Sequence, residues 1–362
     1  MALRILMVLG SLDYCNGITS YAMNYYNNLN KDDYKIDFAV HYNFDSEYKE
    51  KIETDGNKVF FMGDYSIKSL ITLRKRIKKL YENNKYDIVH CHILNLAWFY
   101  LSIAKKCGIT SRIIHSHATK NSDNFYKNIR NKFLKKFGLK YANQYFACSD
   151  LAGKYLFGKK KYEVILNAID YKKFGYSEIF RKKLMAKYNI DSSIFVLGFV
   201  GRFTHQKNIP FLLDVFYKLR NKNFNFKAFI IGDGKEKQYI QNYISSHDLT
   251  DFVFLVESNP NIFEYYSLFD LFLLPSFFEG LPVTGVEAQV AGCGVICSDR
   301  ITEELNFSFN CLFLPINNVN IWVEKIYETK KNIDRNNISN KYDIKQNVTK
   351  LEHIYMNCVK KS

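Results

Sequence analysis

Two glutamates flank a predicted helix start in the second half of the chain. An apolar segment ending at Pro275 predicts a strand, a loop carrying Glu279 follows it, and Pro282 favours the first turn of a helix. Such a helix start offers unpaired backbone N–H groups and a positive dipole end, which suit a phosphate. Glu279 in the loop and Glu287 two turns into the helix can bracket that phosphate and accept hydrogen bonds from hydroxyls. A sugar nucleotide has this layout of hexose, diphosphate and ribose; the alternative is that both glutamates are ordinary loop and helix-surface residues.

Two cations occupy a similar position after an earlier strand. Arg202 follows a predicted buried strand and Lys207 lies five residues further on, so both side chains can converge on the mouth of the sheet. A leaving nucleoside diphosphate gains negative charge in the transition state, and two fixed cations stabilise that charge through charge-assisted hydrogen bonds. Such an arrangement can make a metal ion unnecessary. The alternative is that Arg202 and Lys207 are solvated surface charges.

Four histidines lie at the ends of two predicted strands in the first half. His115 and His117 close one strand, and His90 and His92 close another. We expect one of the first pair to point into a cleft and the other to point away, so either can be the functional residue; the resemblance described below favours His117, and the alternative is a packing or capping histidine. His90 and His92 are expected to be structural. We expect no metal site from the four, because no carboxylate accompanies them at ligand spacing.

The basic residues are concentrated in one window of the chain. The 362 residues carry a formal net charge of +15, and between Lys68 and Lys161 stand 21 Lys and Arg against 4 Asp and Glu. Two basic amphipathic helices are expected there, at about 70–79 and 127–140; such helices suit an anionic membrane surface. The alternative is that their apolar stripes pack into the core and only the lysines reach solvent. The residues expected to face the membrane are Lys127, Arg130, Lys132, Lys135 and Lys136. No motif typical of nucleic-acid binding is present, so we expect no nucleic acid as partner.

Short apolar runs alternate with amphipathic stretches, which is typical of parallel α/β architecture. The predicted strands fall into two series, each able to form one doubly wound sheet. The first series is 4–9, 36–41, 58–62, 88–90, 112–115, 144–148 and 164–166; the second is 195–200, 226–231, 252–256, 271–275 and 294–297. A hinge is expected at 167–170, and a final helix at 345–359.

Composition excludes several classes of protein. With 47% hydrophobic and 24% charged residues, the chain is globular, and its eight scattered cysteines predict reduced, mostly buried thiols. The apolar start at 5–9 is too short for a signal peptide, and no apolar run is long enough to span a bilayer. We therefore expect a protein of the cytoplasm or of the cytoplasmic membrane surface.

Several motifs resemble those of retaining GT-B glycosyltransferases of family 4. Glu279 and Glu287, with seven residues between them, resemble the E-x7-E motif, and the sequence around them looks like the branch that builds bacterial exopolysaccharide and capsule. Other segments match in order and spacing, and the resemblance covers nearly the whole chain. They are the N-terminal glycine loop at 16–21, the N-x-[IV]-D hinge at 167–170, the G-R-x4-K-x segment at 201–208 and the G-[DE]-G turn at 231–234.

The resemblance implies a GT-B fold, with two Rossmann-like doubly wound parallel-sheet domains facing a central cleft. Residues 1–168, with a returning helix at about 345–362, would bind the acceptor, and residues 169–344 would bind the nucleotide sugar. The implied activity is retaining transfer of a hexose-type sugar, with UDP as the expected nucleotide, to a lipid-linked saccharide. No metal and no cofactor are expected.

The family's site residues carry over by motif. Glu279 would hold hydroxyls of the sugar, Glu287 those of the ribose, and Arg202 and Lys207 the diphosphate, while His117 would face the reacting sugar. The implied catalytic residues are Glu279, His117, Arg202 and Lys207. The implied donor-binding residues are Gly17, Arg202, Lys207, Glu279, Gly280, Leu281, Pro282, Val283 and Glu287.

Three positions depart from the family pattern. Asn16 precedes Gly17 where the family has two adjacent glycines, and we expect Asn16 to keep the loop shape in a left-handed backbone. Val256 replaces a glycine near the base, and Gly285 replaces an aliphatic residue in the E-x7-E helix. Two other functions stay open: a GT-B-fold nucleotide-sugar epimerase or hydrolase, and a catalytically silent subunit that anchors a partner at the membrane.

Overall fold

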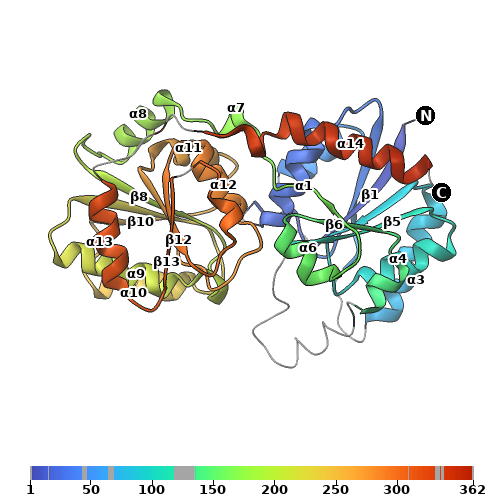
Figure 1. Cartoon of the computed structure of the whole chain (residues 1–362), viewed down its shortest axis with the longest axis horizontal. Helices are drawn as coiled ribbons and strands as arrows, with labels where there is room; N and C mark the ends of the chain where they lie inside the picture. Colours follow the sequence, from blue (N-terminus) through green and yellow to red (C-terminus); the bar gives the residue numbers. More distant parts are fainter. Residues whose placement is uncertain are drawn as a thin grey trace. The chain divides into compact units, whose positions relative to one another are not determined.

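The chain forms two α/β units in the computed structural model (Figure 1). The structure describes residues 2–14, 16–42, 47–63, 69–117, 134, 136–308, 310–330, 335 and 338–360. One unit consists of Met1–Ala168 together with Ile344–Ser362, and the other of Ile169–Asp343. The C-terminal helix therefore belongs to the first unit.

The first unit contains a seven-stranded parallel sheet in the order β3-β2-β1-β4-β5-β6-β7. The strands agree with the predicted runs within two residues at most ends; they are β1 Leu3–Leu9, β2 Tyr34–Val40, β3 Val59–Phe61, β4 Ile88–Cys91, β5 Ser111–Ser116, β6 Gln144–Ala147 and β7 Glu163–Val164. Alternate residues of β1 are buried on opposite faces, because successive side chains of a strand point to opposite sides.

Helices cover both faces of this sheet (Figure 1). Helices α1 and α14 contact each other and enclose one core with Ile5, Met7 and Leu9 of β1. Helix α4 packs on β4 and β5 of the other face, and α3 packs on α4. The helices are α1 Gly17–Asn28, α2 Glu47–Thr54, α3 Leu70–Asn83, α4 Ala97–Lys106, α6 Asp150–Phe157 and α14 Ile344–Lys360.

The second unit contains a six-stranded parallel sheet in the order β10-β9-β8-β11-β12-β13. Its strands are β8 Phe195–Val200, β9 Phe226–Ile231, β10 Val253–Val256, β11 Leu271–Leu274, β12 Gly294–Ser298 and β13 Cys311–Leu314. The sequence prediction of five strands was wrong, because it missed β13. This four-residue edge strand exposes Leu312, so its pattern lacks the continuous apolar run of a central strand.

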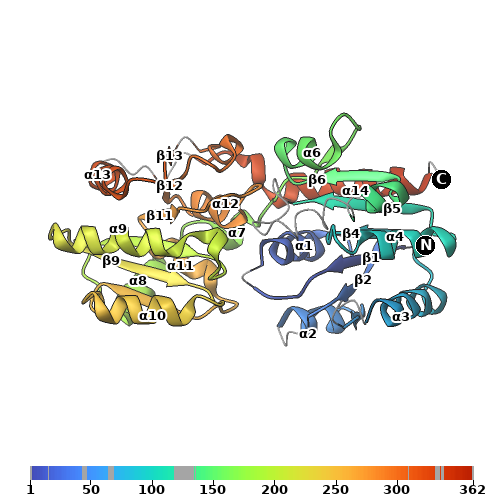
Figure 2. The same ribbon diagram turned by 90° about the horizontal axis from the view of Figure 1, so that it is seen from below.

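The helices of the second unit form two groups (Figures 1 and 2). Helix α9 contacts both α10 and α13, while α11 contacts α7, α8 and α12. The helices are α7 Tyr171–Phe174, α8 Glu178–Lys187, α9 Ile209–Asn221, α10 Lys237–Ser246, α11 Ile262–Leu268, α12 Val283–Val290 and α13 Val319–Thr329, with 3-10 turns η2 His205–Lys207, η3 Glu303–Leu305 and η4 Asn340–Tyr342.

Strand order locates the places where each sheet can bind a ligand. The order reverses between β1 and β4 in the first sheet and between β8 and β11 in the second. In open α/β sheets, ligands bind beyond the carboxyl ends of the strands at such a switch point. The loops after β1 and β4 lead to Gly17 and His92, and those after β8 and β11 carry Lys207 and Glu279. The topology therefore places the candidate residues of each unit beyond the carboxyl ends of the central strands of its sheet.

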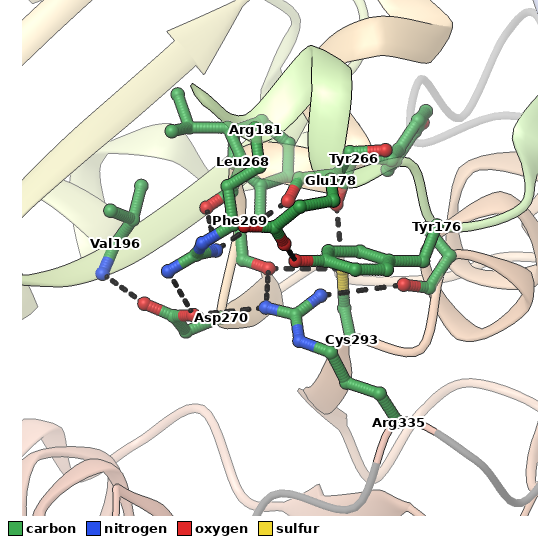
Figure 3. A network of polar contacts seen from close by, with 12 residues as sticks. Tyr176, Glu178, Arg181, Val196, Tyr266, Leu268, Phe269, Asp270, Cys293 and Arg335 are labelled. Carbon is green, nitrogen blue, oxygen red and sulfur yellow. Dashed lines mark hydrogen bonds and ion pairs between the residues drawn. The ribbon is translucent and has the colours of Figure 1, made fainter. Parts of the chain in front are cut away.

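A polar network lies at the amino-terminal ends of the strands in the second sheet (Figure 3). Asp270 precedes β11, and its Oδ1 accepts from Arg181 at 3.0 Å and from Arg335 at 2.9 Å. Its Oδ2 accepts from the backbone N–H of Val196 in β8 at 2.9 Å. One carboxylate thus joins α8, β8 and β11 at their amino-terminal side, away from the switch point, which indicates a structural role.

The basic window divides between core and surface. In α3 the apolar stripe is buried at Leu73 and Ile77, whereas Arg74, Lys75 and Lys78 are exposed, as the packing alternative predicts. Of the residues expected to face a membrane, Lys136 is exposed; Lys127, Arg130, Lys132 and Lys135 lie outside the described residues. Among the described helices, none has the length and apolarity to cross a bilayer.

Candidate functional site

A largely buried ion pair lies beyond β8 and β11. Lys207 Nζ is 2.7 Å from Glu279 Oε1, and the two side chains are only 14% and 12% exposed. The stem of Lys207 crosses Gly201, where an added Cβ would lie 3.2 Å from Lys207 Cε. Lys207 is therefore not a solvated surface charge, and Glu279 is not an exposed loop residue. The fold thus brings this lysine and glutamate, which are 72 residues apart in the sequence, into direct contact.

Backbone contacts hold the Glu279 loop against the turn that carries Lys207. The Phe277 N–H donates to Gln206 O at 2.9 Å, and Gln206 Nε2 donates to Phe278 O at 2.9 Å. Asn208, in a left-handed backbone with φ 54°, donates from Nδ2 to Pro275 O at 3.1 Å. These bonds fix the approach of the two charged side chains before any ligand binds.

The turn after β9 packs against the same backbone. The Phe203 N–H donates to Asp233 O at 2.8 Å. A Cβ on Gly232 would lie 2.0 Å from Gly201 O, and one on Gly234 would lie 2.5 Å from Phe203 O. Only glycine permits this approach, which gives the G-[DE]-G motif a packing reason beside any ligand contact.

Glu287 lies inside the unit rather than on the helix surface. It is 5% exposed in α12, and Tyr266 donates its hydroxyl proton to Glu287 Oε2 at 2.6 Å. Burial raises the pKa of Glu287 to about 7, against the lowering effects of the Tyr266 hydrogen bond and the Lys173 charge. The carboxyl group can therefore exchange a proton near neutral pH.

The remaining residues expected to bind the donor surround the start of α12. Gly280, Leu281 and Val283 are buried, and Pro282 is the N-cap residue. Arg202 is exposed and makes no hydrogen bond or ion pair with the described residues.

Sequence reasoning missed two hydroxyls near the start of α12: Ser276 Oγ and Thr284 Oγ1 are buried and have no partner in the described part of the chain. It also missed Tyr266, whose contact with Glu287 depends on the tertiary fold.

In the first unit, the four histidines form two hydrogen-bonded pairs. His90 Nε2 is 3.0 Å from His115 Nδ1, and His92 Nδ1 is 2.8 Å from His117 Nε2. The rings of His115 and His117 stack with centroids 4.2 Å apart. The expectation that these two would point to different sides was wrong, because residues two apart in a strand share a face. His117 has exposed surface, whereas the other three are buried.

Burial makes these imidazoles neutral. It lowers the pKa of His90, His92 and His115 well below the usual value, and that of His117 to about 3. Ligand nitrogens of His90, His92 and His115 lie within 4.8 Å of one another, which is the kind of group that can hold a metal. Zinc–nitrogen bonds of about 2.0–2.1 Å would require the rings to move closer and to leave their present hydrogen bonds.

Two family models match consecutive parts of the chain. The model for Glycosyltransferase Family 4 matches residues 15–173, and that for Glycosyl transferases group 1 matches residues 180–342. The chain belongs to these glycosyltransferases. The family expected from the E-x7-E and associated motifs is confirmed.

Relatives match nearly the full length of this glycosyltransferase. EpsF of Bacillus subtilis (strain 168) is 27% identical over 97% of this chain and 96% of its own. CapH of Staphylococcus aureus, a capsular polysaccharide biosynthesis glycosyltransferase, is 28% identical over 86% of this chain and 87% of its own. A UDP-Gal:alpha-D-GlcNAc-diphosphoundecaprenol alpha-1,3-galactosyltransferase of Escherichia coli is 26% identical over 81% of this chain and 80% of its own.

A solved structure supports the fold. HepE from Anabaena, crystallised with UDP-glucose, superposes with a TM-score of 0.81 at 15% identity and covers 98% of this chain and 100% of its own. The expected GT-B fold is thus confirmed, with one parallel α/β sheet in each unit.

The N-terminal loop of this glycosyltransferase differs from the expectation. Asn16 has an extended backbone, with φ −98°, and accepts from the Ile18 N–H at 3.1 Å. The predicted left-handed conformation is wrong, because Asn16 is the N-cap of α1 and an N-cap residue adopts extended angles. Gly17 is the exposed first residue of α1.

Proposed function

We propose that this glycosyltransferase moves a hexose-type sugar from a UDP-sugar to a lipid-linked saccharide in exopolysaccharide or capsule synthesis, with retention of configuration. The observation that carries the proposal is the preorganised Lys207–Glu279 pair at the switch point of the second sheet. The relatives support the finer terms: the Escherichia coli relative is named for a UDP-galactose donor and a diphosphoundecaprenol-linked acceptor, and HepE was crystallised with UDP-glucose.

The second unit is proposed to bind the donor. Lys207 and Arg202 bind the diphosphate, Glu279 binds sugar hydroxyls, and Glu287 binds the ribose. The segment from Gly280 to Val283 leads into α12, and the first turn of this helix offers its backbone N–H groups to the phosphates; Pro282, the N-cap residue, has no N–H of its own. Because Lys207 already lies beside a carboxylate, the incoming diphosphate replaces one anion by another and needs little rearrangement of the protein.

The first unit is proposed to bind the acceptor, with Gly17 approaching the donor phosphates and His117 facing the reacting sugar. As the sugar–phosphate bond breaks, negative charge grows on the leaving diphosphate, where Arg202 and Lys207 stabilise it. The leaving phosphate accepts the proton of the acceptor hydroxyl. In this scheme the two side-chain cations supply the charge that a metal ion would otherwise supply, and no cofactor takes part.

A ligand screen tests the donor site. A ligand that binds only the folded protein raises its apparent stability, so at 100 times the Kd the gain is about 2.7 kcal/mol. We expect UDP and one UDP-sugar to raise the melting temperature, GDP and ADP to leave it unchanged, and excess EDTA to change neither result.

The competing functions give different results in the same assay series. Turnover of the sugar nucleotide without any acceptor would indicate an epimerase or hydrolase. Absence of a shift with every nucleotide would indicate a silent subunit. With a lipid-linked acceptor, NMR of the new linkage decides between retention and inversion.

The exposed face of α3 is proposed to bind the cytoplasmic surface of the membrane. Arg74, Lys75, Lys78 and Lys79 are exposed on this helix, and Ile71 is an exposed apolar residue at its start. The side of the helix that carries Leu73 and Ile77 is buried, so the basic face is held outward by core packing. The charged face therefore suits an anionic lipid surface while the fold stays intact.

Vesicle binding tests this surface. Each Lys near an anionic membrane contributes about 1 kcal/mol, so changing Lys75, Lys78 and Lys79 to Gln should weaken binding to phosphatidylglycerol vesicles about 10- to 100-fold at low salt. The matched control changes the exposed Lys182, Lys218 and Lys222 of the second unit to Gln and should bind as the wild type does. Equal losses in both triple variants would mean that net charge alone drives binding and would refute a role for α3.

A further inference from the structure

A series of buried aromatic side chains runs from helix α14 to His117. Three of its links are hydrogen bonds: Tyr355 Oη to His90 Nδ1 at 2.7 Å, His90 Nε2 to His115 Nδ1 at 3.0 Å, and His92 Nδ1 to His117 Nε2 at 2.8 Å. The two histidine pairs stack on each other, with centroids 4.2 Å apart for His90 and His92 and for His115 and His117. The ring of Tyr21 lies against both pairs, with centroids 4.9 Å from His115 and 5.5 Å from His92. The series in order is Tyr355, His90, His115, Tyr21, His92 and His117.

The buried end of the series fixes the direction of its hydrogen bonds. Tyr355 has no exposed surface, and His90 Nδ1 is the hydrogen-bond partner that the described residues offer to its hydroxyl. A buried donor without an acceptor costs about 1–3 kcal/mol, so Tyr355 donates its proton to His90. A neutral imidazole carries a single proton. His90 therefore donates from Nε2 to His115 Nδ1, and His115 carries its own proton on Nε2.

Three buried polar atoms in the middle of the series have no partner among the described residues. They are His115 Nε2, Tyr21 Oη and His92 Nε2. Their rings are in contact, and three unpartnered polar atoms match the two to four polar partners that a buried water needs, so one buried water can join them. His115 and Tyr21 each bring a proton to this point. Tyr21 Oη can accept the proton of His115 Nε2, but its own proton then needs an acceptor, and the nitrogen His92 Nε2 is the remaining atom of the three. If His92 Nε2 carried a proton, the Tyr21 hydroxyl proton would have no side-chain acceptor among these atoms, so His92 Nε2 is bare and its proton lies on Nδ1.

We infer that this series of hydrogen-bonded and stacked side chains holds His117 in the tautomer that carries its proton on Nδ1, and that Tyr355, Tyr21 and His92 are positioning residues for it. His92 Nδ1–H donates to His117 Nε2, so the second nitrogen of His117 must bear the proton. His117 Nδ1 forms no hydrogen bond with the described residues, and His117 is the member of the series with exposed surface. The inference rests on the proposed function, in which this N–H donates to an oxygen of the reacting sugar.

A fixed neutral donor differs from a freely titrating histidine in its chemistry. Because burial lowers the pKa of His117 to about 3, the group stays uncharged at neutral pH. A donor fixed in orientation before the substrate arrives need not reorganise during the reaction. The series also gives α14 a chemical role, because its Tyr355 acts on His117 from the opposite end of the series.

Histidine tautomers can be measured directly. In protein labelled with 15N-histidine, protonated and bare ring nitrogens resonate at well-separated frequencies, and loss of one signal set in His117→Gln assigns His117. We expect Nδ1–H in the wild type and an average of both tautomers in Tyr355→Phe and in Tyr21→Phe. The same two variants should lower kcat about 2- to 10-fold, as expected for one hydrogen bond, with little change in the KM for the donor.

Two tyrosines provide matched controls. Tyr34→Phe removes a hydroxyl that donates to Glu352 O of α14, and Tyr25→Phe removes one that donates to Leu166 O from the same helix as Tyr21. Both controls should keep the wild-type tautomer and kcat, even where they lower the melting temperature.

Several results would overturn the inference. These are a proton on Nε2 of His117 in the wild type, an unchanged tautomer in Tyr355→Phe, or a stoichiometric metal ion on these histidines in the purified protein. The NMR measurement needs no turnover. A wild type without transferase activity but with the expected tautomers would therefore refute the proposed function alone.

Discussion

Replacing Lys207 by alanine is expected to lower sugar transfer about 100- to 1,000-fold, in line with the loss of one preorganised group that stabilises transition-state charge. Lys207 Nζ lies 2.7 Å from Glu279 and the pair is largely buried, so bulk water cannot replace the missing cation as it would at the surface. Initial rates with saturating donor, measured for Lys207→Ala and Lys207→Gln, check the effect.

A second experiment tests whether Lys207 binds the diphosphate or only holds the side chain of Glu279 in place. UDP contains the diphosphate but no hexose, so Lys207→Ala should lose stabilisation by UDP, whereas Glu279→Gln should keep it and lose only the additional stabilisation by the UDP-sugar. If both variants bind UDP equally well, Lys207 serves only to hold Glu279 and its proposed contact with the diphosphate is wrong.

The matched control is another lysine of the same unit in an ion pair. Lys325 lies 2.6 Å from Glu328 on the exposed side of α13, so the distance is similar but the pair is open to solvent. Lys325→Ala should retain full activity, because surface pairs contribute about 0–1 kcal/mol and this one lies outside the proposed site. A comparable loss in Lys325→Ala would attribute the Lys207 effect to general destabilisation.

The Lys207–Glu279 pair also shows what the sequence can and cannot establish. Motif spacing and strand order were enough to place both residues beyond the carboxyl ends of neighbouring strands, because parallel strands meet at one edge of a sheet. Their direct ion pair was not predictable. It depends on the contacts of Gln206 and Asn208 with the loop after β11, which join segments about 70 residues apart.

The same distinction applies to the first unit. Apolar runs predicted its seven strands because buried parallel strands are continuously apolar. The sequence analysis placed His115 and His117 on different sides, although residues two apart in a strand lie on the same face. Their hydrogen bonds to His90 and His92 could not be predicted, because these partners come from a different strand. Tyr21 and Tyr355 carry no motif, and their relation to His117 emerges only when α1 and α14 pack on the same core.

The network around Asp270 gave no signal in the sequence for a related reason. Its partners Arg181 and Arg335 are surface-type residues in polar segments, and only the fold brings them to one carboxylate. Glu287 is the opposite case, because the motif marks it but its burial was unexpected. A helix residue two turns from a loop is expected to be exposed unless the packing of α11 against α12 is known.

Burial of Glu287 predicts that the second unit becomes less stable as pH rises from about 4.5 to 7. The pKa of this group is about 7 in the folded protein against 4.5 normally, so across this window the folded form keeps a proton that the unfolded form has lost. Stability from this proton is complete below pH 4.5 and is lost as pH rises through 7, for a total of about 3 kcal/mol. Glu287→Gln mimics the protonated group and should remove this dependence.

The two tryptophans make the measurement specific to one unit. Trp98 lies in the first unit and the buried Trp322 in the second, so in a Trp98→Phe background fluorescence reports unfolding of the second unit alone. Urea denaturation at several pH values between about 5 and 8 then gives the free energy of unfolding of this background protein with and without the substitution Glu287→Gln. As the pH rises over this range, the free energy of unfolding of the Glu287→Gln protein should increase relative to that of the background protein by about 3 kcal/mol.

Tyr266 supplies an independent test of the cause. Its hydroxyl donates to Glu287 and thereby lowers the pKa of the carboxyl group, so Tyr266→Phe should raise that pKa further and extend the loss of stability to higher pH. The combined variant Tyr266→Phe/Glu287→Gln should show no such extension, because no titrating group is left at the position. If wild type and Glu287→Gln show parallel pH profiles, Glu287 is ionised in the folded protein throughout the range and the interpretation of a buried, proton-exchanging carboxyl group fails.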